Sequence, residues 1–214
     1  ETAPSMAAVS SDGTKVYVAG TAGAGSIVYQ FTMTTAYDLT TVSGAVQSMV
    51  LSNETSNPDA LAFSSDGTKM YTGMGSTVYQ YTLSTAWQVN TASYDNVTLT
   101  SFSTIVGLSV SSDGSKLYVV RSGSPDSVYQ YNLSTTNDIS TGTSAGTLSV
   151  TAVTATPTSG GISSDGTKFY LLSATAVFEL DLSTPYSITT GVYNGATFTP
   201  GFNSEGSGVS SNGR

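Results

Sequence analysis

"FSSDGTKMYTGMGSTVYQYTLSTAW" (residues 63–87) contains the pattern that decides the fold, because its first half recurs along the chain. Related segments are "VSSDGTKVYVAG" (residues 9–20), "VSSDGSKLYVV" (110–120) and "ISSDGTKFYLL" (162–172), and "VSSNGR" (209–214) has the start of a fifth copy. The Asp-Gly or Asn-Gly pairs begin at residues 12, 66, 113, 165 and 212, at intervals of 54, 47, 52 and 47 residues. A period near fifty residues indicates a repeat protein.

Each repeat is predicted to contain four short strands. An Asp-Gly pair between two apolar runs predicts a hairpin, because Gly adopts the positive φ that the turn requires. In the second repeat the strands are expected at "DALAF" (59–63), "KMYTG" (69–73), "TVYQYTLS" (77–84) and "YDNVTLT" (94–100). Alternation in the third strand places Tyr79, Tyr81 and Leu83 on one face. No segment has a helical period.

Four strands in each fifty-residue repeat predict an all-β fold, a β-propeller of four four-stranded blades plus the first strand of a fifth repeat. An open solenoid of stacked hairpins is the alternative. We expect one domain over residues 1–214, with units at 5–58, 59–105, 106–157 and 158–205 and a partial repeat at 206–214.

The repeat "SSDGTKMY…VYQYTLSTAW…TASY" resembles the β-propeller repeats of secreted bacterial proteins and phage structural proteins, and more distantly the lactonase-like and NHL-type propellers. The resemblance covers nearly the whole chain, from about Pro4 to Arg214. It implies propeller architecture but indicates little about activity, since propellers host many functions. The Trp-Asp and Gly-His pairs of one large propeller family are missing, and the paired glycines of kelch repeats do not recur from repeat to repeat.

Composition excludes several function classes. The net charge is −8 with only six Lys and Arg, which disfavours binding to nucleic acid or anionic membranes. His and Cys are absent, so disulfides, thiolate metal sites and the common nucleophile–base pairs are unavailable. No apolar run is long enough to cross a bilayer. Ser and Thr make up about a third of the chain, which suits a secreted or surface-exposed bacterial or viral protein.

The repeated Asp-Gly-x-Lys could mark four symmetric ligand or calcium sites, or four turns. The loop lacks the further carboxylates that a calcium loop needs. We therefore interpret it as a structural turn, in which Asp accepts backbone N–H groups and Lys begins the next strand as a solvated charge. The turn residues are Asp12, Gly13, Lys15, Asp66, Gly67, Lys69, Asp113, Gly114, Lys116, Asp165, Gly166 and Lys168.

Catalytic candidates are few. The resemblance to lactonase-like propellers implies a divalent metal in the central channel, but we find no matching carboxylate and amide set on the first strands. Glu179 and Asp181 form the one close carboxylate pair, and they replace Gln and Thr or Asn of other repeats. They could form an acid–base pair or a cation site, but a charged, solvated strand face is the interpretation we favour. We expect no catalytic residue, metal or other cofactor.

Loop aromatics form a third candidate site. Tyr37, Trp87 and Tyr186 occupy the same position of three repeats, and Asn137 stands there in the remaining one. Such rings could stack on sugars, one weak site per blade, or they could pack under their own loops, which we favour. The sequons at Asn53, Asn96 and Asn132 matter only where the source glycosylates them.

The ends predict assembly. The chain starts "ETAPSM", with no initiator Met at its first position and no signal sequence, so we expect a processed piece of a longer precursor. A first strand is expected at both ends of the chain, one in the first repeat and one in the partial fifth repeat, but a closed four-bladed ring needs only one of them. The extra strand suggests a propeller clipped from a longer one, a strand that docks on a neighbouring subunit, or one larger ring shared by two chains. The expected assembly strand is Gly208, Val209, Ser210 and Ser211.

Our leading hypothesis is a non-enzymatic extracellular propeller, a structural or adhesive subunit of a filament, cell surface or virion. Its expected partners are other copies or neighbouring subunits, with no nucleic acid and no membrane insertion. A carbohydrate-binding propeller that recognises surface glycans is the second hypothesis, and a metal-dependent lactonase-like hydrolase is the third.

Overall fold

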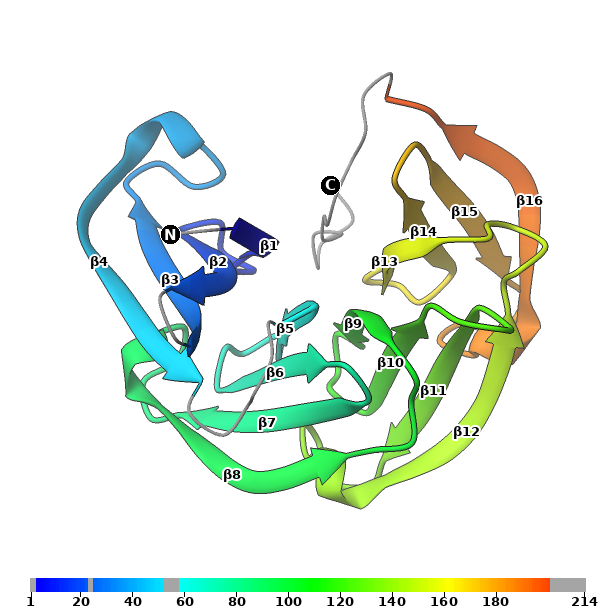
Figure 1. Ribbon diagram of the computed structural model, residues 1–214, viewed down its shortest axis with the longest axis horizontal. Helices are drawn as coiled ribbons and strands as arrows, with labels where there is room; N and C mark the ends of the chain where they lie inside the picture. The colour runs from blue at the N-terminus through cyan, green and yellow to red at the C-terminus, as the bar shows by residue number, and fades with distance from the viewer. Residues whose placement is uncertain (1–2, 23–24, 52–57, 201–214) are drawn as a thin grey trace.

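The computed structural model describes residues 3–22, 25–51 and 58–200. In this part of the chain, sixteen strands form four antiparallel sheets, and each sheet contains four strands in sequence order. Figure 1 shows the sheets as blades around a common centre, with the first strand of each blade innermost and the last outermost. The predicted fold class is therefore confirmed: the protein is an all-β, four-bladed β-propeller.

The blades follow the repeats. Blade 1 contains β1 (Ala3–Val9), β2 (Lys15–Ala22), β3 (Gly25–Met33) and β4 (Val42–Leu51). Blade 2 contains β5 (Ala60–Phe63), β6 (Lys69–Met74), β7 (Thr77–Leu83) and β8 (Ala92–Leu99). Blade 3 contains β9 (Ile105–Val110), β10 (Lys116–Arg121), β11 (Ser127–Leu133) and β12 (Gly142–Ser149). Blade 4 contains β13 (Pro157–Ile162), β14 (Lys168–Ser173), β15 (Val177–Leu182) and β16 (Gly191–Phe198).

A single 3-10 turn precedes the last strand of every blade. These turns are η1 (Leu39–Thr41), η2 (Val89–Thr91), η3 (Ile139–Thr141) and η4 (Ile188–Thr190). Side chains cap two of them: the Asp38 and Asp138 carboxylates accept hydrogen bonds from backbone N–H groups two residues later. Among the described residues, no helix is long and apolar enough to span a membrane.

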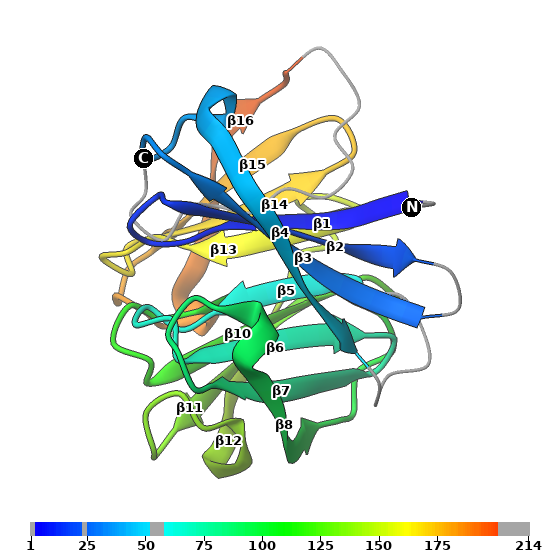
Figure 2. The same cartoon turned by 90° about the vertical axis from the view of Figure 1, so that its left-hand side faces the viewer.

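The hydrophobic core lies between blades. One cluster of buried residues joins blades 1 and 2, a second joins blades 2 and 3, and a third joins blades 3 and 4. Within the described ranges, no cluster joins blade 4 to blade 1, and Figure 1 shows the ring open at that point. Figure 2 views blade 1 from its outer side, where β4 crosses in front of β1 and β3. Blades 1 and 4 are thus end blades, each with one face lacking a neighbouring blade in this part of the chain.

The predicted assembly strand, Gly208 to Ser211, lies outside the described residues.

Candidate functional site

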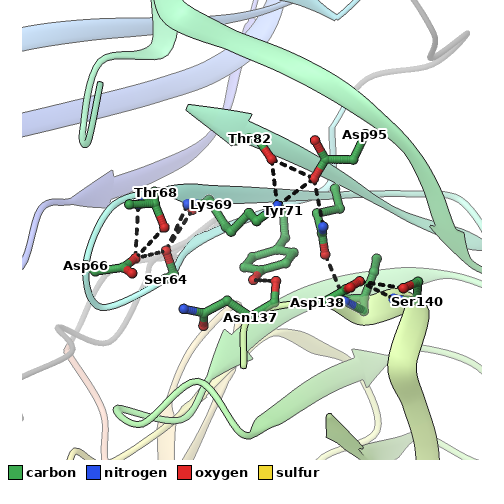
Figure 3. A network of polar contacts seen from close by, with 12 residues as sticks. Ser64, Asp66, Thr68, Lys69, Tyr71, Thr82, Asp95, Asn137, Asp138 and Ser140 are labelled. Carbon is green, nitrogen blue, oxygen red and sulfur yellow. Dashed lines mark hydrogen bonds and ion pairs between the residues drawn. The ribbon is translucent and has the colours of Figure 1, made fainter. Parts of the chain in front are cut away.

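The Asp-Gly turns are closed by hydrogen bonds of their own residues. In blade 2, the Asp66 carboxylate accepts from the Thr68 amide at 3.0 Å and from the Ser64 hydroxyl at 2.6 Å (Figure 3). The Ser64 hydroxyl oxygen in turn accepts from the Lys69 amide at 2.9 Å. Equivalent bonds surround Asp12, Asp113 and Asp165. The four carboxylates thus bond within their own turns, which is the geometry of a structural turn.

Acidification is expected to destabilise the fold through these turns. The Thr167 amide and then the Ser163 hydroxyl lower the pKa of Asp165 from 3.8 to about 2. At Asp12, Asp66 and Asp113 burial raises the pKa, but hydrogen bonds from neighbouring residues outweigh it and leave the pKa lowered. Because the folded state releases these protons more readily, their stabilisation is complete above the unfolded-state pKa and is lost as the pH falls toward 2.

Urea unfolding at about pH 5 and about pH 2.5 measures this loss. Asp165→Asn is expected to reduce the difference between the two conditions, because one group that titrates in this window is removed. An unchanged pH dependence in that variant would contradict the assignment.

The loop aromatics lie on the turns of their own blades. Tyr37, Trp87 and Tyr186, and Asn137 at the same position, all have φ between 61° and 65°. The Trp87 amide donates to the Gly67 carbonyl at 2.9 Å, and a Cβ added to Gly67 would lie 2.2 Å from the indole. The rings of Tyr37 and Tyr186 meet Gly13 and Gly166 in the same way. Each ring therefore packs against its own turn, which favours the packing role over sugar stacking.

Glu179 and Asp181 lie side by side on β15 and share one cation. Lys168 Nζ is 2.8 Å from Glu179 Oε1 and also pairs with Asp181. The Asn194 amide donates to both carboxylates, at 2.8 and 3.1 Å. Hydrogen bonds from Lys168 lower the pKa of both acids. No group of three His, Cys, Asp or Glu suited to a metal ion occurs among the residues that the structure describes.

A cavity of about 600 Å³ lies inside the ring. Its walls come from the four inner strands and the turns that follow them, with Trp87 and Phe63 at one side. Serine hydroxyls, glycines and aliphatic side chains line it, and among the residues that the structure describes none of those in the lining carries a carboxylate, amine or imidazole. The described part of the lining therefore offers hydrogen-bonding groups but no side chain that could act as a general acid or base near neutral pH.

Two polar contacts fasten blade 2 to blade 3. The Tyr71 hydroxyl, on β6, donates to the backbone carbonyl of Asn137 at 2.7 Å (Figure 3). The Gln80 side-chain oxygen, on β7, accepts from the Ile139 amide at 2.8 Å. Tyr71 and Gln80 are paired across the two strands, so both act on the same loop of blade 3. Because these groups are buried, losing either partner would leave an unsatisfied polar atom.

The same two contacts recur at the other packed blade boundaries. Between blades 1 and 2, Tyr17 donates to the Trp87 carbonyl at 3.0 Å and the Val89 amide donates to Gln30 at 2.9 Å. Between blades 3 and 4 the pairs are Tyr118 with the Tyr186 carbonyl and the Ile188 amide with Gln130, both at 2.8 Å. These roles were not predicted from the sequence, although two signals recur in it: a Tyr two residues after each turn Lys, and a Gln in "VYQF" (residues 28–31) and in both "VYQY" segments.

Replacing Gln30 by leucine is expected to lower the free energy of unfolding by about 1–3 kcal/mol, because the buried Val89 amide loses its acceptor. Gln30 is 1% exposed and Val89 is 0% exposed, so water cannot substitute without disrupting the boundary. Chemical denaturation measures the change. Glu179→Leu is the matched variant at the same position of blade 4. In dilute protein it should lower the free energy of unfolding by less than Gln30→Leu does, because Glu179 is partly exposed. Equal losses would contradict a role specific to packed boundaries.

Blade 1 presents to solvent the face that other blades bury. Leu39, the first residue of η1, is 66% exposed, whereas Val89, Ile139 and Ile188 at the same position are at most 1% exposed. The exposed large hydrophobic residues of the described chain all belong to the end blades. They are Val9, Tyr37, Leu39, Val42, Val46 and Val50 in blade 1, and Val192 and Phe198 in blade 4.

Among the described residues, nothing covers the opposite face of blade 4. Phe198 pairs with Val177 across β15 and β16 and is 66% exposed. Its register equivalents Met49, Leu99 and Leu148 all pack against the inter-blade clusters. Glu179 and Tyr170 occupy the Gln and Tyr positions of the boundary contacts, and both are partly exposed. The two end-blade faces are therefore the candidate site.

No protein-family model matches the sequence, and no curated protein sequence matches it. Among solved structures, a candidate 6-phosphogluconolactonase from Bacteroides uniformis matches with a TM-score of 0.63 and 15% identity, over 92% of this chain and 55% of that one. A similar candidate from Bacteroides fragilis has a TM-score of 0.60 and 12% identity, with the same shares of the two chains covered.

A protein of unknown function from Desulfotomaculum acetoxidans has a TM-score of 0.58 and 14% identity, over 92% of this chain and 70% of that one. This chain thus spans little more than half the length of the first two structures it matches. At these identities the likeness shows the fold alone. The class that fold and site define is a β-propeller with two unpaired end-blade faces in its described part.

Proposed function

We propose that this chain is a non-enzymatic structural subunit of an extracellular or surface-exposed assembly, and that its end blades join it to neighbouring subunits. The observation that carries the proposal is the location of exposed apolar side chains. In the described chain they lie only on blades 1 and 4, on strands and turns whose equivalents elsewhere contact another blade. Exposed apolar surface gathered in this way marks an interaction site.

The chemistry of the chain supports a structural role. The residues described in the cavity lining include no titratable side chain, and the sequence contains no His or Cys. The Glu179 and Asp181 carboxylates are engaged by Lys168 and Asn194. A surface rich in Ser and Thr with 9% charged residues supports an extracellular location.

Sedimentation velocity over a wide concentration range, with electron microscopy of the same samples, tests the proposal. We expect the mass to rise with concentration and ordered particles or polymers to form. A chain that stays monomeric at every concentration and binds sugars saturably would overturn the structural role in favour of the lectin hypothesis.

A further inference from the structure

We infer that the neighbour is a second copy of this chain, bound head-to-tail so that blade 4 of one copy packs against blade 1 of the next. This inference rests on the proposed structural function and names its partner. It follows from comparing the two exposed faces with the three packed boundaries inside the chain, which show what each face contacts when it is covered.

Each internal boundary contains apolar residues at the same three repeat positions: two are buried, and the fourth-strand residue is partly buried. A valine of the third strand and its partner on the fourth strand pack together with the first residue of the next blade's 3-10 turn. In the three clusters these sets are Val28, Met49 and Val89; Val78, Leu99 and Ile139; and Val128, Leu148 and Ile188. The three valines are 0% exposed. The sets therefore define what a complete boundary contains.

The equivalent three residues of a fourth boundary are divided between the two end blades. Val177 and Phe198 are the strand pair of blade 4, and Leu39 is the turn residue of blade 1. Phe198 and Leu39 are each 66% exposed, and Val177 is partly exposed. Bringing blade 4 of one copy against blade 1 of another would complete the set. Burying these side chains would stabilise the contact as it stabilises the three internal boundaries.

A polar contact is available in the same register. At each internal boundary a Gln side-chain oxygen accepts from the amide of the buried turn residue. Blade 4 has Glu179 at the Gln position, and a carboxylate is also an acceptor. Among the described residues, the Leu39 amide donates to no acceptor. Glu179 of one copy can therefore accept from the Leu39 amide of the next, as a charge-assisted hydrogen bond.

The contact must be heterologous, because the two faces differ. Blade 1 supplies the turn residue and the donor amide, whereas blade 4 supplies the strand pair and the acceptor. Two blade 1 faces brought together would have neither Val177 nor Glu179 opposite Leu39. Head-to-tail contacts generate a closed ring where the rotation closes and a filament where it does not.

Two substitutions separate the faces. Leu39→Glu places a carboxylate opposite Glu179 and should disable the blade 1 face, while Phe198→Glu should disable the blade 4 face. Val192→Glu is the matched control, because Val192 is also 66% exposed but is expected to lie outside the contact. Its register equivalents in the other blades are Ser43, Ser93 and Thr143. All three are exposed, although another blade packs against each of their blades. Unchanged thermal melting of dilute protein confirms that each variant is folded.

The particle mass of single variants and of their mixture tests the inference. Each variant alone should be monomeric, and the equimolar mixture should form a one-to-one dimer, because one intact face of each kind remains. Val192→Glu should associate like the unmodified chain, and Glu179→Leu should weaken association by about tenfold or more. If the unmodified chain associates but both face variants still associate alone, this inference is wrong and the structural function stands. If the unmodified chain never associates, both are wrong.

Discussion

Replacing Tyr71 by alanine is expected to lower the free energy of unfolding by about 3–5 kcal/mol. Tyr71 is fully buried between blades 2 and 3, and its hydroxyl donates to the Asn137 carbonyl at 2.7 Å. The substitution removes a large ring from the middle of a packed boundary, leaves a cavity and removes the donor for a buried carbonyl. Denaturant unfolding followed by circular dichroism measures the loss.

Tyr170→Ala is the matched control, because Tyr170 has the same repeat position in blade 4 but is partly exposed. In dilute protein, where copies are separated, it should cost about 1 kcal/mol or less, as surface substitutions usually do. A loss as large as that of Tyr71→Ala would show that the outer face of blade 4 is already covered within one chain.

Replacing Gly67 by alanine is expected to cost about 2–5 kcal/mol. Gly67 has φ +70°, in the left-handed region that disfavours side chains. The added Cβ would also lie 2.2 Å from the Trp87 indole, so the ring must leave its place on the turn. Thermal and denaturant unfolding measure the cost, and Trp87 fluorescence reports the displacement of the ring, since Trp87 is the only tryptophan.

Gly75→Ala separates the two causes. Gly75 also has positive φ, at +52°, but an added Cβ would meet nothing within 4 Å. Gly75→Ala should therefore lower the free energy of unfolding only by the backbone strain of the left-handed conformation, about 1–2 kcal/mol, and should leave the Trp87 fluorescence unchanged. Equal losses in the two variants would contradict the packing of Trp87 on its turn.

Much of the fold could be predicted from the sequence, because its signals are local. The spacing of the Asp-Gly pairs predicted four repeats, and the alternation in "TVYQYTLS" predicted a strand with Tyr79, Tyr81 and Leu83 on one face. The structure has the expected sheets, although β1 begins at Ala3, two residues before the first expected unit. The strands and turns of each repeat depend on neighbouring residues, and the number of blades follows from the spacing of the repeats along the chain.

The candidate site could not be predicted in the same way, because the exposure of a residue depends on where its blade lies in the ring. Residue type alone does not give that position. Leu39 and Ile188 are both aliphatic residues at the start of a 3-10 turn, yet one is 66% exposed and the other is fully buried. In the described chain, a blade precedes that of Ile188 and packs against it, whereas none packs against Leu39. Glu179 illustrates the same point: its substitution for Gln was visible in the sequence, but we interpreted it as a surface charge because the boundary role of Gln was unknown.

Disulfide trapping between copies tests the central claim most directly, because the chain contains no cysteine of its own. Leu39→Cys and Phe198→Cys, prepared separately and mixed under mild oxidation, should form a cross-linked dimer that contains one chain of each kind. Leu39→Cys mixed with Val192→Cys should not. Efficient trapping in the first mixture alone is the result that a head-to-tail boundary between blade 4 and blade 1 predicts. Equal trapping in both mixtures, or none in either, would contradict it.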